Sequence, residues 1–94
     1  MATVFIPTML QNLAGGVKQV DIQGTNVRQI LDRLEEQYPG MKASLMEEGR
    51  IRRNLSVAID GEISRMGLLE KVGESSEVHF IPAIGGGGMK TTSA

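Results

Sequence analysis

One long helical pattern lies in this 94-residue sequence, and strand patterns lie on both sides of it. Within residues 24–40, GTNVRQILDRLEEQYPG, four apolar residues follow the spacing i, i+3, i+4, i+7 of one helix face: Val27, Ile30, Leu31 and Leu34. We expect Thr25 to be the N-cap and Pro39-Gly40 to end the helix. With no second long helix to pack against, this apolar face requires a sheet to cover it.

Four segments around the helix predict the strands of that sheet: residues 3–10 with a bend at Pro7, residues 17–22, residues 55–59 and residues 77–83. We expect Gly15-Gly16 to supply the turn between the first two strands, which then form a hairpin. Asp60-Gly61 predicts a second hairpin after residue 59.

The segments between these strands are shorter. Residues 41–49 predict a short second helix with Leu45 and Met46 facing inward. Residues 50–54, RIRRN, form a small basic cluster, which is either a solvated loop or a contact for a partner or an anion. Three apolar residues are expected to cap the core before the last strand: Leu68, Leu69 and Val72.

This order of elements favours an α+β fold of the β-grasp type, a roll in which a mixed sheet of four or five strands packs on one main helix. The last strand contains the apolar run VHFI and is expected to lie centrally, beside the first strand. The folded domain is predicted to cover residues 1–84, and residues 85–94 form a flexible glycine-rich tail.

The composition excludes several kinds of site. The chain has no cysteine, which removes disulfides, thiolate zinc ligands and thiol nucleophiles, and His79 is its one histidine. Ten basic and eleven acidic residues give a net charge of -1, so we expect no nucleic-acid partner. No apolar run is long enough to span a bilayer, and no basic region precedes the apolar N-terminal stretch. We therefore expect a cytoplasmic protein that is not an enzyme and that binds no metal, cofactor or membrane.

Strand alternation predicts a second surface on the sheet face that the helix leaves uncovered. Period-two geometry sends Phe5, Ser56, Ala58, His79 and Ile81 to that face. Phe5 and Ile81 are expected to form an apolar patch with His79 beside them, which is either a partner site or a surface covered by loops. His79 alone is also compatible with an ordinary surface position.

The C-terminal stretch IPAIGGGGMKTTSA runs from a strand directly into four glycines. Glycines in such a tail serve either as a loose linker or as a backbone slim enough to enter a narrow channel in a partner. Residues 82–87 reach at most about 20 Å when extended, which is long enough to enter another protein's active site.

The sequence FIPAIGGG at the end of a β-grasp pattern resembles the C-terminus of the ubiquitin-like sulfur carriers of the MoaD/ThiS family. The opening VFIPTML, the central LEEQYPGM and the closing DGEISRMGLLEKVGESSEVHFIPAIGG are similar to the branch that carries sulfur for cysteine biosynthesis. The resemblance covers nearly all of residues 2–87.

In that family a C-terminal Gly-Gly carboxylate is adenylated by an E1-like enzyme that uses ATP, and is then converted to a thiocarboxylate that donates sulfur. The resemblance maps this motif onto Gly85, Gly86 and Gly87, with Gly87 as the reactive terminus and Gly88 as the alternative. The implied partners are an E1-like adenylyltransferase and a sulfur-accepting synthase, either a cysteine synthase or the large subunit of molybdopterin synthase. The residues that we predict to bind these partners are Phe5, Ala58, His79, Ile81, Pro82 and Ile84.

The tail departs from the family pattern, because residues 88–94 follow the Gly-Gly motif and leave no carboxylate at Gly87. We therefore expect a peptidase to cut after Gly87 or Gly88, and the resemblance implies a JAMM-type zinc metallopeptidase. Other readings of the sequence are the small subunit of molybdopterin synthase, a ubiquitin-like modifier joined to lysines, and a β-grasp interaction module whose tail is never cut. Possible acceptors for modifier chains are Lys18, Lys42, Lys71 and Lys90.

Overall fold

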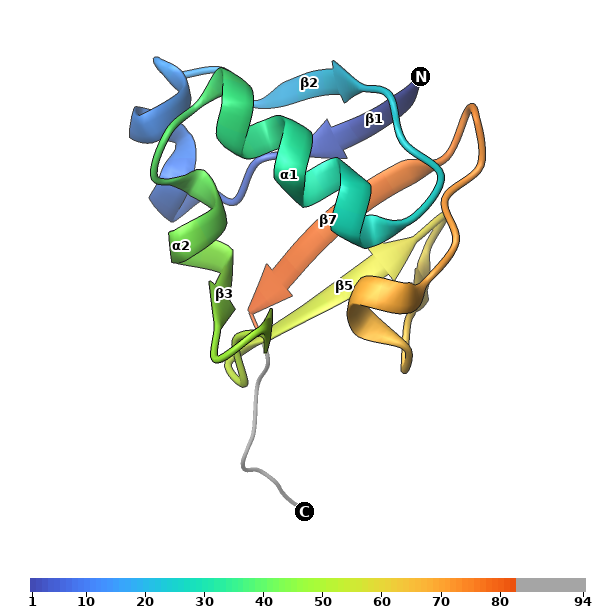
Figure 1. Ribbon diagram of the computed structural model, residues 1–94. Helices are drawn as coiled ribbons and strands as arrows, with labels where there is room; N and C mark the ends of the chain where they lie inside the picture. Colours follow the sequence, from blue (N-terminus) through green and yellow to red (C-terminus); the bar gives the residue numbers. More distant parts are fainter. Residues whose placement is uncertain (83–94) are drawn as a thin grey trace.

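The computed structural model describes residues 1–82, and Figure 1 shows how its elements are arranged. The predicted tail residues, Ile84 and Gly85 to Gly88, lie outside the described residues. The helices are the 3-10 helix η1 (Thr8–Ala14), α1 (Val27–Gln37), α2 (Met41–Leu45) and the 3-10 helix η2 (Gly67–Leu69). The strands are β1 (Ala2–Phe5), β2 (Gln19–Ile22), β3 (Met46–Glu47), β4 (Arg50–Ile51), β5 (Leu55–Ile59), β6 (Glu62–Ile63) and β7 (Glu77–Pro82).

Five strands form one mixed sheet in the order β2-β1-β7-β5-β6, while β3 and β4 pair separately. The central strand β7 is parallel to β1 and antiparallel to β5. The long helix α1 crosses one face of this sheet (Figure 1). The predicted β-grasp roll is confirmed, including the central position of the last strand beside the first.

The helix and the sheet share one hydrophobic core. The four apolar residues predicted for the inner face of α1 are all fully buried. The sheet contributes buried residues at alternate positions: Val4, Ile6, Leu55, Val57, Val78 and Phe80. Burying an apolar side chain of this size contributes about 1.5–3 kcal/mol relative to leaving it exposed, so this face supplies most of the driving force for folding.

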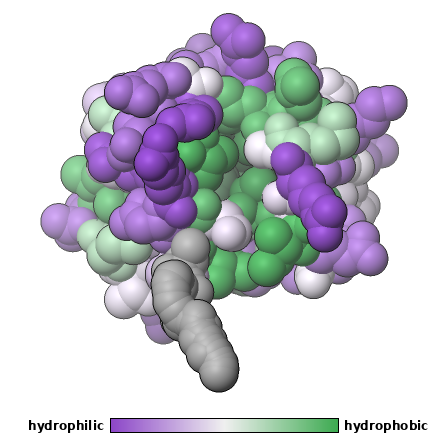
Figure 2. All heavy atoms as spheres, turned by 90° about the horizontal axis from the view of Figure 1, so that it is seen from below, coloured by the Kyte–Doolittle hydropathy of each residue, from purple (hydrophilic) through white to green (hydrophobic). Residues whose placement is uncertain are grey.

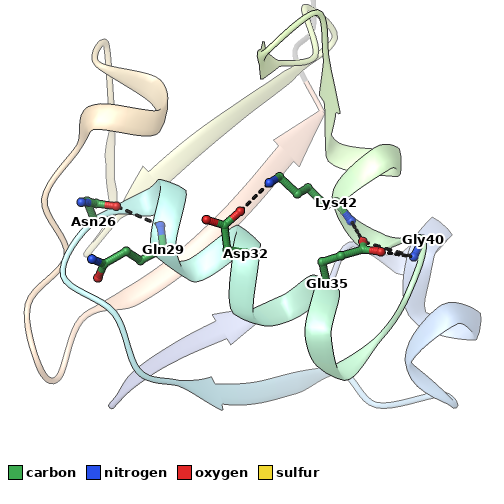
Figure 3. Close-up of polar contacts among 6 residues, drawn as sticks. All are labelled: Asn26, Gln29, Asp32, Glu35, Gly40 and Lys42. Carbon is green, nitrogen blue, oxygen red and sulfur yellow. Dashed lines mark hydrogen bonds and ion pairs between the residues drawn. The ribbon is translucent and has the colours of Figure 1, made fainter.

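The N-cap of α1 is Asn26, one residue after the predicted Thr25. Asn26 Oδ1 accepts a hydrogen bond from the backbone N–H of Gln29 at 2.9 Å (Figure 3). Thr25 bonds to the Gln29 side chain instead, donating from its backbone N at 2.8 Å and from Oγ1 at 3.0 Å. The prediction was wrong because adjacent residues both carried oxygens suited to capping, and the apolar spacing alone does not choose between them.

Two carboxylates fix the corner between α1 and α2 (Figure 3). Glu35 accepts hydrogen bonds from the backbone N–H of Gly40 at 3.1 Å and of Lys42 at 2.9 Å. These two bonds, first the one from Gly40, hold the pKa of Glu35 below its ordinary value. Asp32 forms an ion pair with Lys42, and the hydrogen bond in that pair lowers the pKa of Asp32. Gly40 itself has a φ of 98°, which a residue with a side chain adopts only under strain.

The first strand is shorter than predicted. β1 ends at Phe5, and after Pro7 the chain forms η1 in place of a continued strand. The ring of Pro7 fixes its φ at -55°, and its carbonyl accepts a hydrogen bond from Leu10 N–H at 2.8 Å, which begins the 3-10 turn. The predicted glycine turn is confirmed, because Gly15 and Gly16 have φ values of 66° and 88°.

A small hairpin of β3 and β4 occupies the region expected to be a helix end and a loop. Met46 is partly buried in β3, and Arg50 pairs with Glu47 across the hairpin. The two residues at its tip, Glu48 and Gly49, both have positive φ, as in the tightest type of hairpin turn.

Of the three residues predicted to cap the core, two do so and one does not. Val72 is buried, and Leu68 packs against the core from η2. Leu69 is 71% exposed, so the prediction for that residue was wrong. The three residues of η2 make only one short turn, which directs neighbouring side chains to different sides.

Candidate functional site

The sheet face opposite α1 carries one row of side chains from four strands. Phe5 on β1 lies opposite His79 on β7. His79 also lies opposite Ala58 on β5, which in turn lies opposite Ile63 on β6. Residues that face each other across paired strands point to the same side of the sheet. We call Phe5, His79, Ala58 and Ile63 the outer row.

The outer row begins with two aromatic side chains, Phe5 and His79, that contact each other. The rings of Phe5 and His79 are stacked, with centroids 4.1 Å apart and an angle of 7° between their planes. Aromatic pairs of this kind contribute about 0.5–1.5 kcal/mol beyond the area that they bury. His79 Nε2 also lies 3.6 Å from Glu77 Oε1, so a carboxylate borders the stacked pair on its own strand.

The middle of the outer row does not offer the surface that was predicted for it. Ala58 is only 3% exposed, although it lies on the outer face. Its methyl group is the smallest side chain in the row, and the larger neighbours His79 and Ile63 flank it on both sides. Ala58 therefore presents almost no surface of its own for the partner contact that was predicted for it.

A groove of about 380 Å³ lies where the outer row meets the end of β7. Its lining comes from two segments, residues 5–9 and residues 79–82. Met9 at the start of η1 is 58% exposed, and Ile81 is 39% exposed. Figure 2 shows the molecule from below the view of Figure 1, and hydrophobic side chains gather on this face. The predicted apolar patch is therefore present, and η1 extends it.

The strand β7 carries this surface directly to the base of the tail. Pro82, the last residue of β7, is exposed and lies opposite Leu55 at the start of β5. Of the predicted partner residues, the structure brings together Phe5, His79, Ile81 and Pro82. Larger hollows elsewhere on the surface, such as one of about 540 Å³ lined by Met1 and Gly24, do not include residues of β7.

Ile63 is the main residue of this surface that the sequence analysis missed. It is 63% exposed, more than any other member of the outer row. A sequence signal for it existed, because a two-residue turn at Asp60-Gly61 pairs Ile59 with Glu62 and therefore Ala58 with Ile63. Following that register one residue further would have placed Ile63 on the outer face.

Two other kinds of feature are absent from the described residues, a metal-binding group and a membrane-spanning helix. Between residues 1 and 82, His, Asp and Glu side chains form no group of three or more that is placed to hold a metal ion. Within the same range no helix combines the length and the apolar character needed to cross a membrane. What the surface offers is an apolar face with a groove, beside the start of a glycine-rich tail.

Comparison with known proteins places this surface in a family context. The model of the ThiS family matches residues 4–87. The sulfur carrier protein CysO of Mycobacterium tuberculosis is 31% identical over 90 residues, which cover 90% of this chain and 97% of CysO. The resemblance to the MoaD/ThiS family is thereby confirmed.

Solved structures agree with the sequence comparison. The crystal structure of the BexX/CysO complex of Amycolatopsis orientalis matches with a TM-score of 0.85 and 35% identity, covering 93% of this chain and all of the matched chain. The crystal structure of Mycobacterium tuberculosis CysO matches with a TM-score of 0.84 and 29% identity, covering 89% of this chain and 100% of CysO. The chain belongs to the ThiS family.

Proposed function

We propose that this protein is a sulfur carrier in biosynthesis. The carboxylate of Gly87, once residues 88–94 have been removed, attacks the α-phosphate of ATP in the active site of an E1-like enzyme and releases pyrophosphate. A sulfide donor then displaces AMP from the acyl adenylate and leaves a thiocarboxylate. That group donates its sulfur to an accepting enzyme, and the protein itself is a carrier and not an enzyme.

One observation supports this proposal above the others: the central strand ends at Pro82 beside an apolar groove, and the glycine run begins three residues later in the sequence. β7 pairs with β5 as far as Pro82, so the last described residue of the strand has a fixed place beside the groove. A partner that covers the outer row would therefore receive the tail in a defined direction, and no catalytic side chain is required from this protein.

The likeness to CysO supports the cysteine branch as the destination of the sulfur, because the relative that matches over nearly its full length is named as a sulfur carrier. The family match ends at residue 87, which favours Gly87 over Gly88 as the reactive terminus. We propose an E1-like adenylyltransferase, a cysteine synthase-like acceptor and a JAMM-type metallopeptidase as partners. ATP would be bound by the activating enzyme and not by this chain.

The test compares chains that differ only at the C-terminus, each incubated with ATP and the E1-like adenylyltransferase of the same organism. A chain ending at Gly87 should support ATP–pyrophosphate exchange, while the full chain should not. When a sulfide source is added, the intact mass of the chain ending at Gly87 should change by the exchange of one oxygen for sulfur.

A chain ending at Gly88 and a chain ending in Gly87→Ala are the matched controls. If only the chain ending at Gly88 is active, the reactive terminus is Gly88 and not Gly87. Equal exchange by Gly87→Ala would contradict a narrow channel that admits only glycine. Exchange by the full chain would show that tail removal is not required, and absence of exchange from every chain would exclude the carrier function with this enzyme.

A further inference from the structure

A second surface lies at the same end of the molecule as Pro82, the last residue of β7. Because Leu55 pairs with Pro82, the turn that precedes β5, residues 52–54, lies next to the last described residue of β7. The hairpin of β3 and β4 leads into this turn, and Figure 1 shows β3 near the arrowhead of β7. The basic run RIRRN, which the proposed function does not use, therefore lies beside the C-terminal end of β7.

Arg52 anchors this segment to the rest of the protein. Its guanidinium donates to the backbone carbonyl of Ala43 at 3.0 Å and to Glu47 Oε1 at 3.3 Å. The backbone is fixed as well, because Arg52 N–H donates to the carbonyl of Leu45 at 3.1 Å and Leu55 N–H donates to the carbonyl of Arg52 at 3.0 Å. The neighbouring arginines therefore project from a backbone whose position is set by hydrogen bonds.

Arg50 and Arg53 do not anchor the segment as Arg52 does. Arg53 is exposed and takes part in no ion pair among residues 1–82. Arg50 approaches Glu48 only to 3.9 Å, and both side chains are more than half exposed. An exposed pair at this distance contributes little to stability, so neither guanidinium is explained by the fold.

We propose that Arg50 and Arg53 form a basic edge that docks against acidic side chains beside the channel of the enzyme that takes the tail. The planar guanidinium donates two parallel hydrogen bonds to a carboxylate, which suits an acidic protein surface. A nucleic-acid backbone fits poorly, since Glu47 and Glu48 lie on the same hairpin and the whole chain has a net charge of -1. The identity of the enzyme rests on the proposed function, but the acidic nature of the partner surface does not.

A charge at the rim of an interface acts mainly on association. Complementary charges raise the rate of encounter and lose this effect as salt screens them. The basic edge should therefore lower the KM for the carrier at low ionic strength and leave kcat nearly unchanged. Its position beside the tail means that the same encounter brings the glycines to the channel.

The first test uses the full chain and hexaglutamate as an acidic probe. Amide NMR signals of residues 50–54 should shift during titration at low salt, and the shifts should disappear in Arg53→Glu. Arg33→Glu is the control, because it makes the same charge change at a distant place. Arg33 lines the hollow at Met1, where β1 begins. Since β1 and β7 are parallel, this hollow lies at the end of the sheet where β7 begins, away from Pro82. Equal shifts in Arg53→Glu, or no shifts in the wild-type protein, would overturn the basic edge. Equal shifts with inorganic phosphate would show a small-anion site in place of a protein-docking edge.

The second test uses chains that end at Gly87 and measures adenylation. Arg50→Glu and Arg53→Glu should each raise KM about three- to tenfold at low salt, and the difference should shrink at high salt. Arg33→Glu should leave KM unchanged. If the wild-type chain is adenylated and all three variants match it, the basic edge is wrong and the carrier function stands. If the wild-type chain is not adenylated, the carrier function fails, while the hexaglutamate titration still decides the nature of the edge.

Discussion

The two faces of the central sheet are built from the same strands and do different things. Val4 and Val78 are fully buried under α1, while the residues next to them in sequence, Phe5 and His79, are stacked on each other at the outer surface. A single step along a strand thus changes a side chain from a part of the core into a part of a recognition surface. In this protein the side chains of the inner face determine the fold, and those of the outer face can be substituted to suit a partner without disturbing the core.

Leu34→Ala should have the largest effect and should act on stability alone. Leu34 is fully buried between α1 and the sheet, so removing its side chain leaves a cavity and should lower the free energy of unfolding by about 2–5 kcal/mol. Chemical denaturation measures this loss. Ile63→Ala is the outer-face control and should change stability by about 0.5 kcal/mol or less. Similar losses for both variants would remove the distinction between the faces.

Ile63→Asp should have the opposite profile. Its side chain is 63% exposed, so the variant should fold normally but lose about tenfold in kcat/KM for adenylation of a chain ending at Gly87. Leu69→Asp is the matched control, because Leu69 is exposed to a similar degree but is not a member of the outer row. An equal loss of kcat/KM in both variants would mean that adding a charge anywhere on the surface impairs adenylation, and that the outer row has no special role.

Asn26→Ala tests how much the N-cap of α1, which lies outside the core, contributes to the stability of the helix that covers the inner face. The variant loses the hydrogen bond to Gln29 N–H at the start of α1, which should lower the free energy of unfolding by about 1 kcal/mol. Thr25→Ala should cost less, because Gln29 Oε1 keeps its bond from the Thr25 backbone. A larger loss from Thr25→Ala would assign the cap to the residue that the sequence first indicated.

Glu35→Gln should have the smallest effect, and only over part of the pH range. The folded pKa of Glu35 lies below its ordinary value of 4.5, so its stabilisation is fully present above that value and is lost as the pH falls through the folded pKa. The difference in stability between wild type and variant should therefore be present at neutral pH and shrink below pH 4.5. Denaturation at several pH values measures this, with the exposed neighbour Glu36→Gln as control. A difference that grows on acidification would contradict the depressed pKa.

The elements with strong periodic patterns were predicted well. The inner face of α1 and the alternation of β5 and β7 follow from apolar spacing, because a buried face leaves a repeating mark in the sequence. The two-residue turn at Asp60-Gly61 was predicted for a similar reason, since few dipeptides adopt its geometry. These features are specified by neighbouring residues alone.

The features that were missed depend on contacts between distant segments. Ile6 N–H still donates to the carbonyl of Lys18 at 2.9 Å, and after Pro7 the chain leaves the sheet as η1, whose Gln11 side chain donates back to the carbonyl of Ile6 at 3.1 Å. The short hairpin of β3 and β4 has only two residues in each strand, too few for alternation to appear. Ala58 was misjudged because alternation gives the face of a side chain and not what covers it. The reactive glycines stay a prediction, since they lie beyond residue 82.

The parallel pairing of β1 with β7 joins the first strand of the chain to the last one. β7 lies between β1 and β5, so the sheet cannot close until residues 77–82 have been synthesised. Contacts this far apart in sequence also slow folding, because a long loop must close before they form. A chain interrupted before β7 would lack the strand that joins the two halves of the sheet, and we expect it not to fold.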